Sequence, residues 1–136
     1  MDKLKRKKRE CLPNARSALY LAALTVVASD GTIVDPEASD IEKIVKGDHD
    51  NFDLALKAFR DNSYESCVDL VAYSLNEQQQ NALIAVLLDL AMTDGKLAPA
   101  EERIILSYVT KFGVPAQEFR NLCHYISMKN NLGLFD

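Results

Sequence analysis

Four acidic side chains recur in matched pairs along this chain of 136 residues. Asp30 and Glu37 belong to one segment, and Asp94 and Glu101 belong to a second segment later in the chain. Both segments read D-G-x-[I/L]-x-x-x-E. Carboxylate oxygens are the ligands that hard divalent cations such as Ca²⁺ and Mg²⁺ prefer. The pattern therefore suggests an acidic site for a divalent metal ion that takes ligands from both segments.

The motif matches the second half of a calcium-binding EF-hand loop, but the sequence excludes a complete loop. An EF-hand needs oxygen ligands two and four residues before this aspartate. Those positions hold Ala28 and Val26 in one copy, and Met92 and Leu90 in the other. A pooled site would have to draw on further acids nearby. The additional candidate ligands are Asp89 and Glu102.

Each copy of the motif also predicts a corner between two helices. Gly31 and Gly95 suit a left-handed helix end, so we expect the preceding helix to stop there. Glu37 and Glu101 then fall in the first turn of the next helix, where backbone N–H groups favour an anion. The aspartates would lie at the unfavourable end of a helix dipole, which invites a cation or free N–H groups. Two interpretations stay open: a cation site, or helix caps that only shape the fold.

The elements that position these corners are predicted to be about seven helices, because no segment shows the alternation of a strand. Two of them, Asn14–Ser29 and Ser74–Asp94, are apolar nearly all round, which is typical of helices at the centre of a domain. We expect Ser74 and Glu77 to form a capping box at the start of the second. The other expected helices cover about 35–47, 51–60, 64–73, 99–112 and the residues from 115 onward. The predicted fold class is all-α.

The two apolar helices and their corners are predicted to be an internal duplication. Residues 21–45 and 85–109 align with six identities, three of which lie in the motif. The identical pairs are Leu24/Leu88, Asp30/Asp94, Gly31/Gly95, Glu37/Glu101, Ile41/Ile105 and Val45/Val109. We expect half-repeats of about 15–47 and 79–112, related by a pseudo-twofold axis.

The formal net charge of −4 averages two unlike parts of the chain. Residues 1–10 carry a net charge of +4, and residues 11–136 carry −8. We expect a flexible basic leader over residues 1–12 and a single helical domain over residues 13–136. An acidic domain repels phosphate backbones, so the chain gives no strong nucleic-acid signal. The leader, in contrast, suits the surface of an anionic membrane.

Other reactive side chains form no recognisable catalytic constellation. The three cysteines, Cys11, Cys67 and Cys123, are too far apart for a zinc motif, and we expect them to be small apolar fillers. Asp48 and His49 lie in an acidic stretch that we expect to be a solvated loop before a helix. The sequence contains no phosphate-binding, dinucleotide-binding or nucleophile motif, which predicts that the protein is not an enzyme. It shows neither a secretory signal nor a membrane-spanning run, which predicts a cytoplasmic protein.

Paired D-G-x-[I/L]-x-x-x-E corners after apolar helices resemble the tellurite-resistance TerB family. The resemblance covers about residues 15–128 and rests mainly on the two motif copies. It implies a seven-helix fold with pseudo-twofold halves, and a role in tellurite or chemical-stress resistance. It also implies that Asp30, Glu37, Asp94 and Glu101 bind a divalent metal ion. The implied partners are other proteins of a cytoplasmic, membrane-associated stress-response complex.

Two alternative functions stay open at this stage. In the first, the chain is a protein-interaction scaffold, and its repeated acidic corners are purely structural. In the second, the chain is an adaptor that docks onto an anionic membrane or nucleic acid through its basic leader. The leader contains no aromatic residues that could stack on bases, which disfavours single-stranded nucleic acid as its target. The oligomeric state is not predicted by the sequence.

Overall fold

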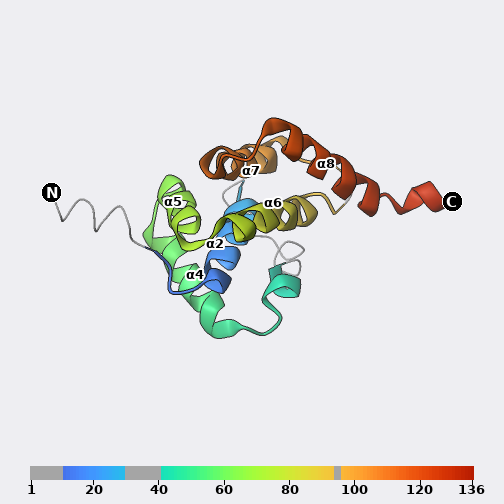
Figure 1. Ribbon diagram of the computed structural model, residues 1–136. Helices are drawn as coiled ribbons and strands as arrows, with labels where there is room; N and C mark the ends of the chain where they lie inside the picture. The colour runs from blue at the N-terminus through green and yellow to red at the C-terminus, as the bar shows by residue number, and fades with distance from the viewer. Residues whose placement is uncertain (1–10, 30–40, 94–95) are drawn as a thin grey trace.

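The computed structural model describes residues 11–29, 41–93 and 96–136, and every regular element in these ranges is helical (Figure 1). The elements are α2 (Ala15–Val27), α4 (His49–Asp61), α5 (Tyr64–Ser74), α6 (Glu77–Ala91), α7 (Pro99–Phe112), α8 (Ala116–Asn130) and the 3₁₀-helix η1 (Leu132–Phe135). Residues 41–45 are also helical. The predicted all-α fold is confirmed. The basic leader up to residue 10 and the predicted start of the second helix lie outside the described residues.

Helix α2 forms the centre of the core, as its apolar sequence predicts. Ten of its 13 residues are buried, and it packs against α4, α5, α6 and α7. Helix α6, the second apolar helix, packs against α2, α7 and α8. In Figure 1, α2 lies among the other helices, whereas α8 lies on the outside, and η1 extends beyond it at the C-terminus. Helix α2 thus has the predicted central position, whereas only five of the 15 residues of α6 are buried.

The start of α6 differs from the predicted capping box. Asn76, not Ser74, is the N-cap: its side chain accepts a hydrogen bond from Gln79 N, and the Gln79 side chain accepts one from Asn76 N. Ser74 instead ends α5, where its hydroxyl donates to Leu70 O. The prediction was wrong because an asparagine caps a helix as well as a serine does. The pair Asn76–Gln79 has the same spacing as the pair Ser74–Glu77.

Both central helices end earlier than the glycines of the motif predict. Helix α2 ends at Val27 and helix α6 ends at Ala91, each four residues before its glycine. The predicted ends at Ser29 and Asp94 are therefore corrected. A turn follows each helix at residues 28–29 and 92–93. The acidic motifs consequently begin beyond the last helical turn.

The two helix ends are nevertheless equivalent, as an internal duplication requires. Val27 and Ala91 each precede the aspartate of their own motif by the same interval. The capping N–H of Ala28 donates to Leu24 O over 3.0 Å, and that of Met92 donates to Leu88 O over 2.8 Å. Buried residues occupy the other identical pairs that the structure describes, Ile41/Ile105 and Val45/Val109. The two helix ends thus have the same local structure. The copies differ further along, because Lys46 and Gly47 form a turn with positive φ, whereas the equivalent residues, Thr110 and Lys111, belong to α7.

Helix α7 has the predicted boundaries. Pro99 lies in its first turn, where a missing N–H costs nothing. Gly113 follows its last residue with a φ of 74°, the left-handed conformation that favours glycine at a helix end. Of the cysteines, Cys67 is buried as predicted, but Cys11 is exposed. The Cys11 thiol donates to Tyr73 O, so it is not an apolar filler.

Candidate functional site

The second acidic corner lies between the end of α6 and the start of α7. Glu101 and Glu102 both lie in the first turn of α7, as the motif predicts. Glu101 is half-buried and Glu102 is exposed. The dipole of α7 favours negative charge in this turn. The electrostatic environment of the two glutamates is therefore favourable even without a cation.

Asp89, proposed as an additional ligand, already has a cationic partner. Its Oδ1 lies 3.0 Å from Lys129 Nζ of α8 and accepts a hydrogen bond from Asn130 Nδ2 over 3.2 Å. The same Asn130 Nδ2 donates to Met92 O over 2.8 Å. The end of α8 thus holds the end of α6 immediately before the second motif. A metal ion at Asp89 would have to compete with the Lys129 ammonium group.

The equivalent position in the first copy carries a different polar group. Thr25 aligns with Asp89 in the repeat and is buried. Its hydroxyl donates to Ala22 O over 2.6 Å and is paired with the Tyr108 hydroxyl of α7 over 2.8 Å. Burial raises the pKa of Tyr108 well above its ordinary range. The first copy therefore contains a closed, neutral contact where the second has a charged one.

The repeat relates the pair Thr25–Tyr108 to a second pair of residues elsewhere in the chain. Tyr108 is equivalent to Ile44, so the buried pair Thr25–Tyr108 corresponds to the pair Asp89–Ile44. Asp89 and Ile44 line the same cavity, of about 390 Å³. Lys43, Thr93, Lys129 and Asn130 also line it. A cavity thus lies beside Asp89 and Ile44, whereas the Tyr108 ring fills the equivalent space beside Thr25.

Of the four predicted principal ligands, only Glu101 lies in the part of the chain that the structure describes. Asp30, Glu37 and Asp94 lie outside it, as do Gly31 and Gly95. Within residues 11–29, 41–93 and 96–136, no three histidine, cysteine, aspartate or glutamate side chains are close enough to share a metal ion. The described acids therefore do not form a complete site by themselves. The motif's carboxylate donors remain suitable for a hard divalent cation.

A polar cluster near the N-terminal ends of α2 and α4 was not predicted by the sequence. Asp48, expected in a solvated loop, accepts hydrogen bonds from Tyr20 Oη over 3.0 Å and from Asn51 Nδ2 over 2.9 Å. Asn51 Oδ1 accepts another from Asn14, the N-cap of α2. Donation by Asn51 and by Tyr20 lowers the pKa of the Asp48 carboxyl. The signal in the sequence was Tyr20, a polar tip on an otherwise apolar helix.

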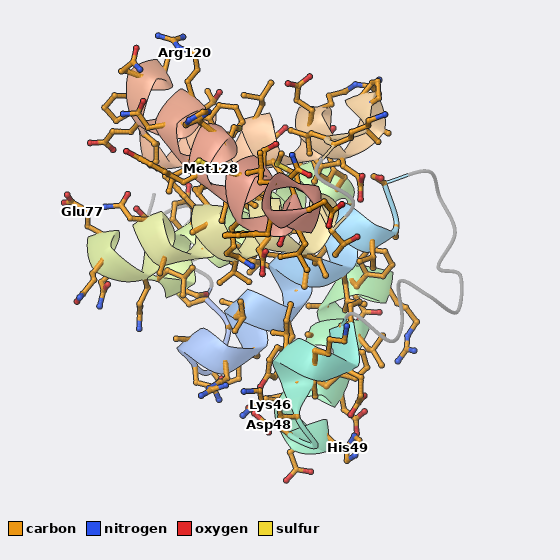
Figure 2. All side chains as sticks on the ribbon, turned by 90° about the vertical axis from the view of Figure 1, so that its right-hand side faces the viewer. Lys46, Asp48, His49, Glu77, Arg120 and Met128 are labelled. Atoms are coloured by element: carbon orange, nitrogen blue, oxygen red, sulfur yellow. The ribbon has the colours of Figure 1, made fainter. Side chains whose placement is uncertain are left out.

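This cluster fixes the turn that joins the helical residues 41–45 to α4. Lys46 and Gly47 adopt positive φ values of 52° and 82°, and Asp48 is the N-cap of α4. Figure 2 shows Lys46, Asp48 and His49 together at this turn. The Asp48 side chain makes no capping bond, since it points to Tyr20 and Asn51 instead. The role of this acid is structural.

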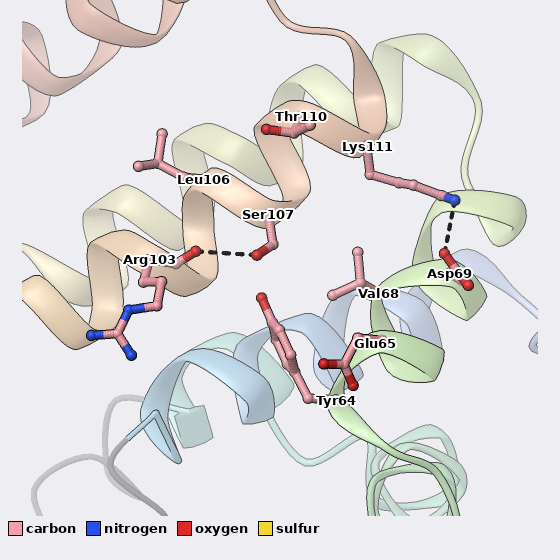
Figure 3. Close-up of a pocket in the computed structure, with 9 residues that line it drawn as sticks. All are labelled: Tyr64, Glu65, Val68, Asp69, Arg103, Leu106, Ser107, Thr110 and Lys111. Atoms are coloured by element: carbon pink, nitrogen blue, oxygen red, sulfur yellow. Dashed lines mark hydrogen bonds and ion pairs between the residues drawn. The ribbon is translucent and has the colours of Figure 1, made fainter.

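A groove of about 450 Å³ lies between α5 and α7 (Figure 3). Tyr64 and Val68 give it an apolar floor, Leu106 also lines it from α7, and Glu65 and Arg103 lie at its rim. At one end the Lys111 ammonium group lies 2.8 Å from Asp69 Oδ1. This hydrogen bond raises the pKa of Lys111. The sequence predicted both helices, but not the groove between them.

None of the helices in the described ranges combines the length and the apolarity needed to cross a bilayer. Comparisons with curated proteins and with solved structures gave no significant match. A family model described as "Tellurite resistance protein TerB" matches residues 49–124. The match extends from α4 into α8 and includes the second acidic corner. Because it covers more than half of an all-helical chain with the duplicated corners described above, this chain belongs to the TerB family.

Proposed function

We propose that this chain is a cytoplasmic, non-enzymatic TerB module that acts in tellurite or chemical-stress resistance and binds a divalent metal ion. The proposed ligands are Asp30, Glu37, Asp94 and Glu101. The observation that carries the proposal is the equivalence of the two central helix ends, which start both acidic segments from the same point of the repeat. The TerB match supports the family role.

The described residues narrow the proposed ligand set. Glu101 lies in the first turn of α7, where the helix dipole favours a negative charge. Asp89 is the weaker candidate, since Lys129 already neutralises it. Glu102 is exposed on the same turn as Glu101. It also contributes to the raised pKa of the Cys123 thiol, whose main cause is burial. We therefore do not include Asp89 and Glu102 among the proposed metal ligands.

Titration calorimetry tests this proposal directly. Ca²⁺, Mg²⁺, Mn²⁺ and Zn²⁺ are titrated into the wild-type chain and into Asp30→Asn/Asp94→Asn. We expect heat of binding for at least one cation in the wild type, and none in the double variant. Asp61→Asn is the matched control, because Asp61 is an exposed acid on α4 that pairs with Lys57. Absence of heat in the wild type contradicts the proposal.

The second candidate function is an interaction scaffold, and the groove between α5 and α7 favours it. Its apolar floor and charged rim are typical of surfaces that receive a peptide or a helix. On this account the acidic corners only shape the fold. Asp30→Asn and Asp94→Asn should then lower the melting temperature equally with and without a chelator. Stabilisation by a metal ion in the wild type alone contradicts the purely structural role of the corners.

A further inference from the structure

The outer face of α8 and the segment that follows it carry large apolar side chains exposed to solvent. Tyr125 is 60% exposed and Met128 is 45% exposed. Leu132 and Phe135 of η1 are 71% and 87% exposed. Tyr125 and Met128 lie three residues apart on α8, and Leu132 and Phe135 lie three residues apart on η1, so each pair lies on one side of its own helix. An exposed apolar stripe of this kind is typical of an interaction surface.

A cavity lies beside the earlier part of α8. It has a volume of about 310 Å³ and an apolar wall formed by Ile84, Val114 and Leu122. Asn121 and Tyr125 also line it, so the cavity adjoins the beginning of the apolar stripe. Its volume lies at the lower end of the range of about 300–1,000 Å³ that is typical of ligand pockets in proteins. An apolar segment thus follows the C-terminal end of α8, and a cavity with an apolar wall lies beside the earlier part of the same helix, from Glu118 to Tyr125.

We propose that two copies of this chain associate through antiparallel α8 helices, and that the segment Leu132–Phe135 of each copy occupies the cavity of the other. A twofold axis across the middle of α8 brings the C-terminal end of each helix to the N-terminal end of its partner. Both contacts then form at once, which gives the self-complementary interface of a closed dimer. Figure 1 shows why the segment is available: η1 extends away from the helical body. The proposal is independent of the cation site.

The charges along α8 agree with the antiparallel direction. Glu118 lines the cavity near the start of α8, and Lys129 lies in its last turn, before η1. Antiparallel pairing about the middle of the helix places Glu118 of each copy beside Lys129 of the partner. Lys129 is 58% exposed even though it is paired with Asp89, so a second carboxylate can approach its ammonium group. Parallel pairing would instead place like charges together.

Sedimentation velocity of the full chain over a range of concentrations tests the proposal. We expect the wild type to form a dimer, and Leu132→Ser/Phe135→Ser to weaken dimerisation by at least tenfold. The double variant should keep the fold, because both side chains are exposed. Leu54→Ser is the matched control, since Leu54 is an exposed leucine on α4, and it should dimerise like the wild type.

A mixing experiment tests the direction of the pair. Glu118→Lys alone and Lys129→Glu alone each create like-charge contacts, so each should remain monomeric. An equimolar mixture of the two variants restores both opposite-charge contacts and should dimerise. A wild type that stays monomeric at about 1 mM, a concentration that populates even a millimolar dimer, overturns the proposal. A monomeric wild type that binds lipid vesicles only with Leu132 and Phe135 intact also overturns it, and assigns the segment to a membrane.

Discussion

Thr25 and Asp89 occupy the same position of the repeat, but one lies in the core and the other lies at the surface. In the first copy a neutral hydroxyl lies in the core against the hydroxyl of Tyr108. In the second copy a carboxylate faces an open cavity and pairs with Lys129. An unpaired charge is costly inside a core, whereas a paired carboxylate at the surface is not. The duplication therefore diverged at the turn before each acidic motif.

The buried pair Thr25–Tyr108 leads to a prediction about stability. Thr25→Val leaves the Tyr108 hydroxyl unpaired in the core and should lower the free energy of unfolding by about 1–3 kcal/mol. Tyr108→Phe leaves Thr25 its bond to Ala22 O and should cost only about 0.5–1.5 kcal/mol. The double variant should cost less than the sum, because no orphan hydroxyl remains in it. Urea denaturation measures all three; strictly additive costs would show that the hydroxyls are not coupled.

Asp48 leads to a prediction about pH. Hydrogen bonds from Asn51 and Tyr20 lower the pKa of this carboxyl from its ordinary 3.8. A lowered pKa stabilises the folded state above the unfolded pKa, and this contribution is lost as the pH falls through the folded pKa. Asp48→Asn should therefore melt at a lower temperature than the wild type at pH 7, with a difference that shrinks below pH 3.8. Thermal melts of both proteins from pH 7 to pH 2.5, about 1.3 units below the ordinary pKa of Asp, measure this; a difference independent of pH argues against the ionised pair.

At the scale of helices, apolar patterning predicted the elements well and their ends less well. The apolar sequence of α2 was enough to place this helix in the core, because a helix without a polar face must be covered. Helix α6 was expected to be covered in the same way, but only five of its 15 residues are buried. The ends were misplaced because glycine is a good helix terminator, so the glycines of the two motifs predicted helix ends beside them. Both helices instead end four residues before these glycines. The caps of α6 were misplaced because Asn76 and Gln79 repeat the spacing of Ser74 and Glu77. The sequence therefore offered two equally good capping boxes for α6, and only the folded structure shows which of them forms.

The cap of α6 gives the prediction at this scale. Asn76→Ala removes the acceptor for Gln79 N and should lower the free energy of unfolding by about 1 kcal/mol. Glu77→Ala should cost much less, because the capping box does not include Glu77. Chemical denaturation of the two variants beside the wild type measures the difference. A larger loss for Glu77→Ala than for Asn76→Ala would support the capping box predicted from the sequence.

The candidate site was less predictable than the fold. The motif predicted the place of Glu101 and Glu102 in the first turn of α7. It could not predict that Lys129, which lies on a different helix from Asp89, neutralises that acid. The cluster around Asp48 was missed for the same reason, since one of the two side chains that donate to this carboxylate, Tyr20, lies on α2, far away in the sequence. Periodicity identifies the face of a helix, but partners from other helices are set by tertiary packing.

At the scale of the whole molecule, the central claim is that the two halves supply one site for a divalent cation. The central helices α2 and α6 pack together, and each leads into one acidic segment. A shared site requires carboxylates from both halves, so removing either half should remove binding. Two separate sites, or purely structural corners, have no such requirement. Single substitutions in each half therefore distinguish these accounts.

The most direct measurement is the thermal unfolding of the wild type, Asp30→Asn and Asp94→Asn, each with excess divalent cation and with chelator. A cation at 100 times its Kd stabilises the folded state by about 2.7 kcal/mol, enough to raise the melting temperature by several degrees. We predict this increase in the wild type and its loss in both single variants. A wild-type melting temperature that no cation raises, or an increase that survives in either single variant, contradicts the shared site.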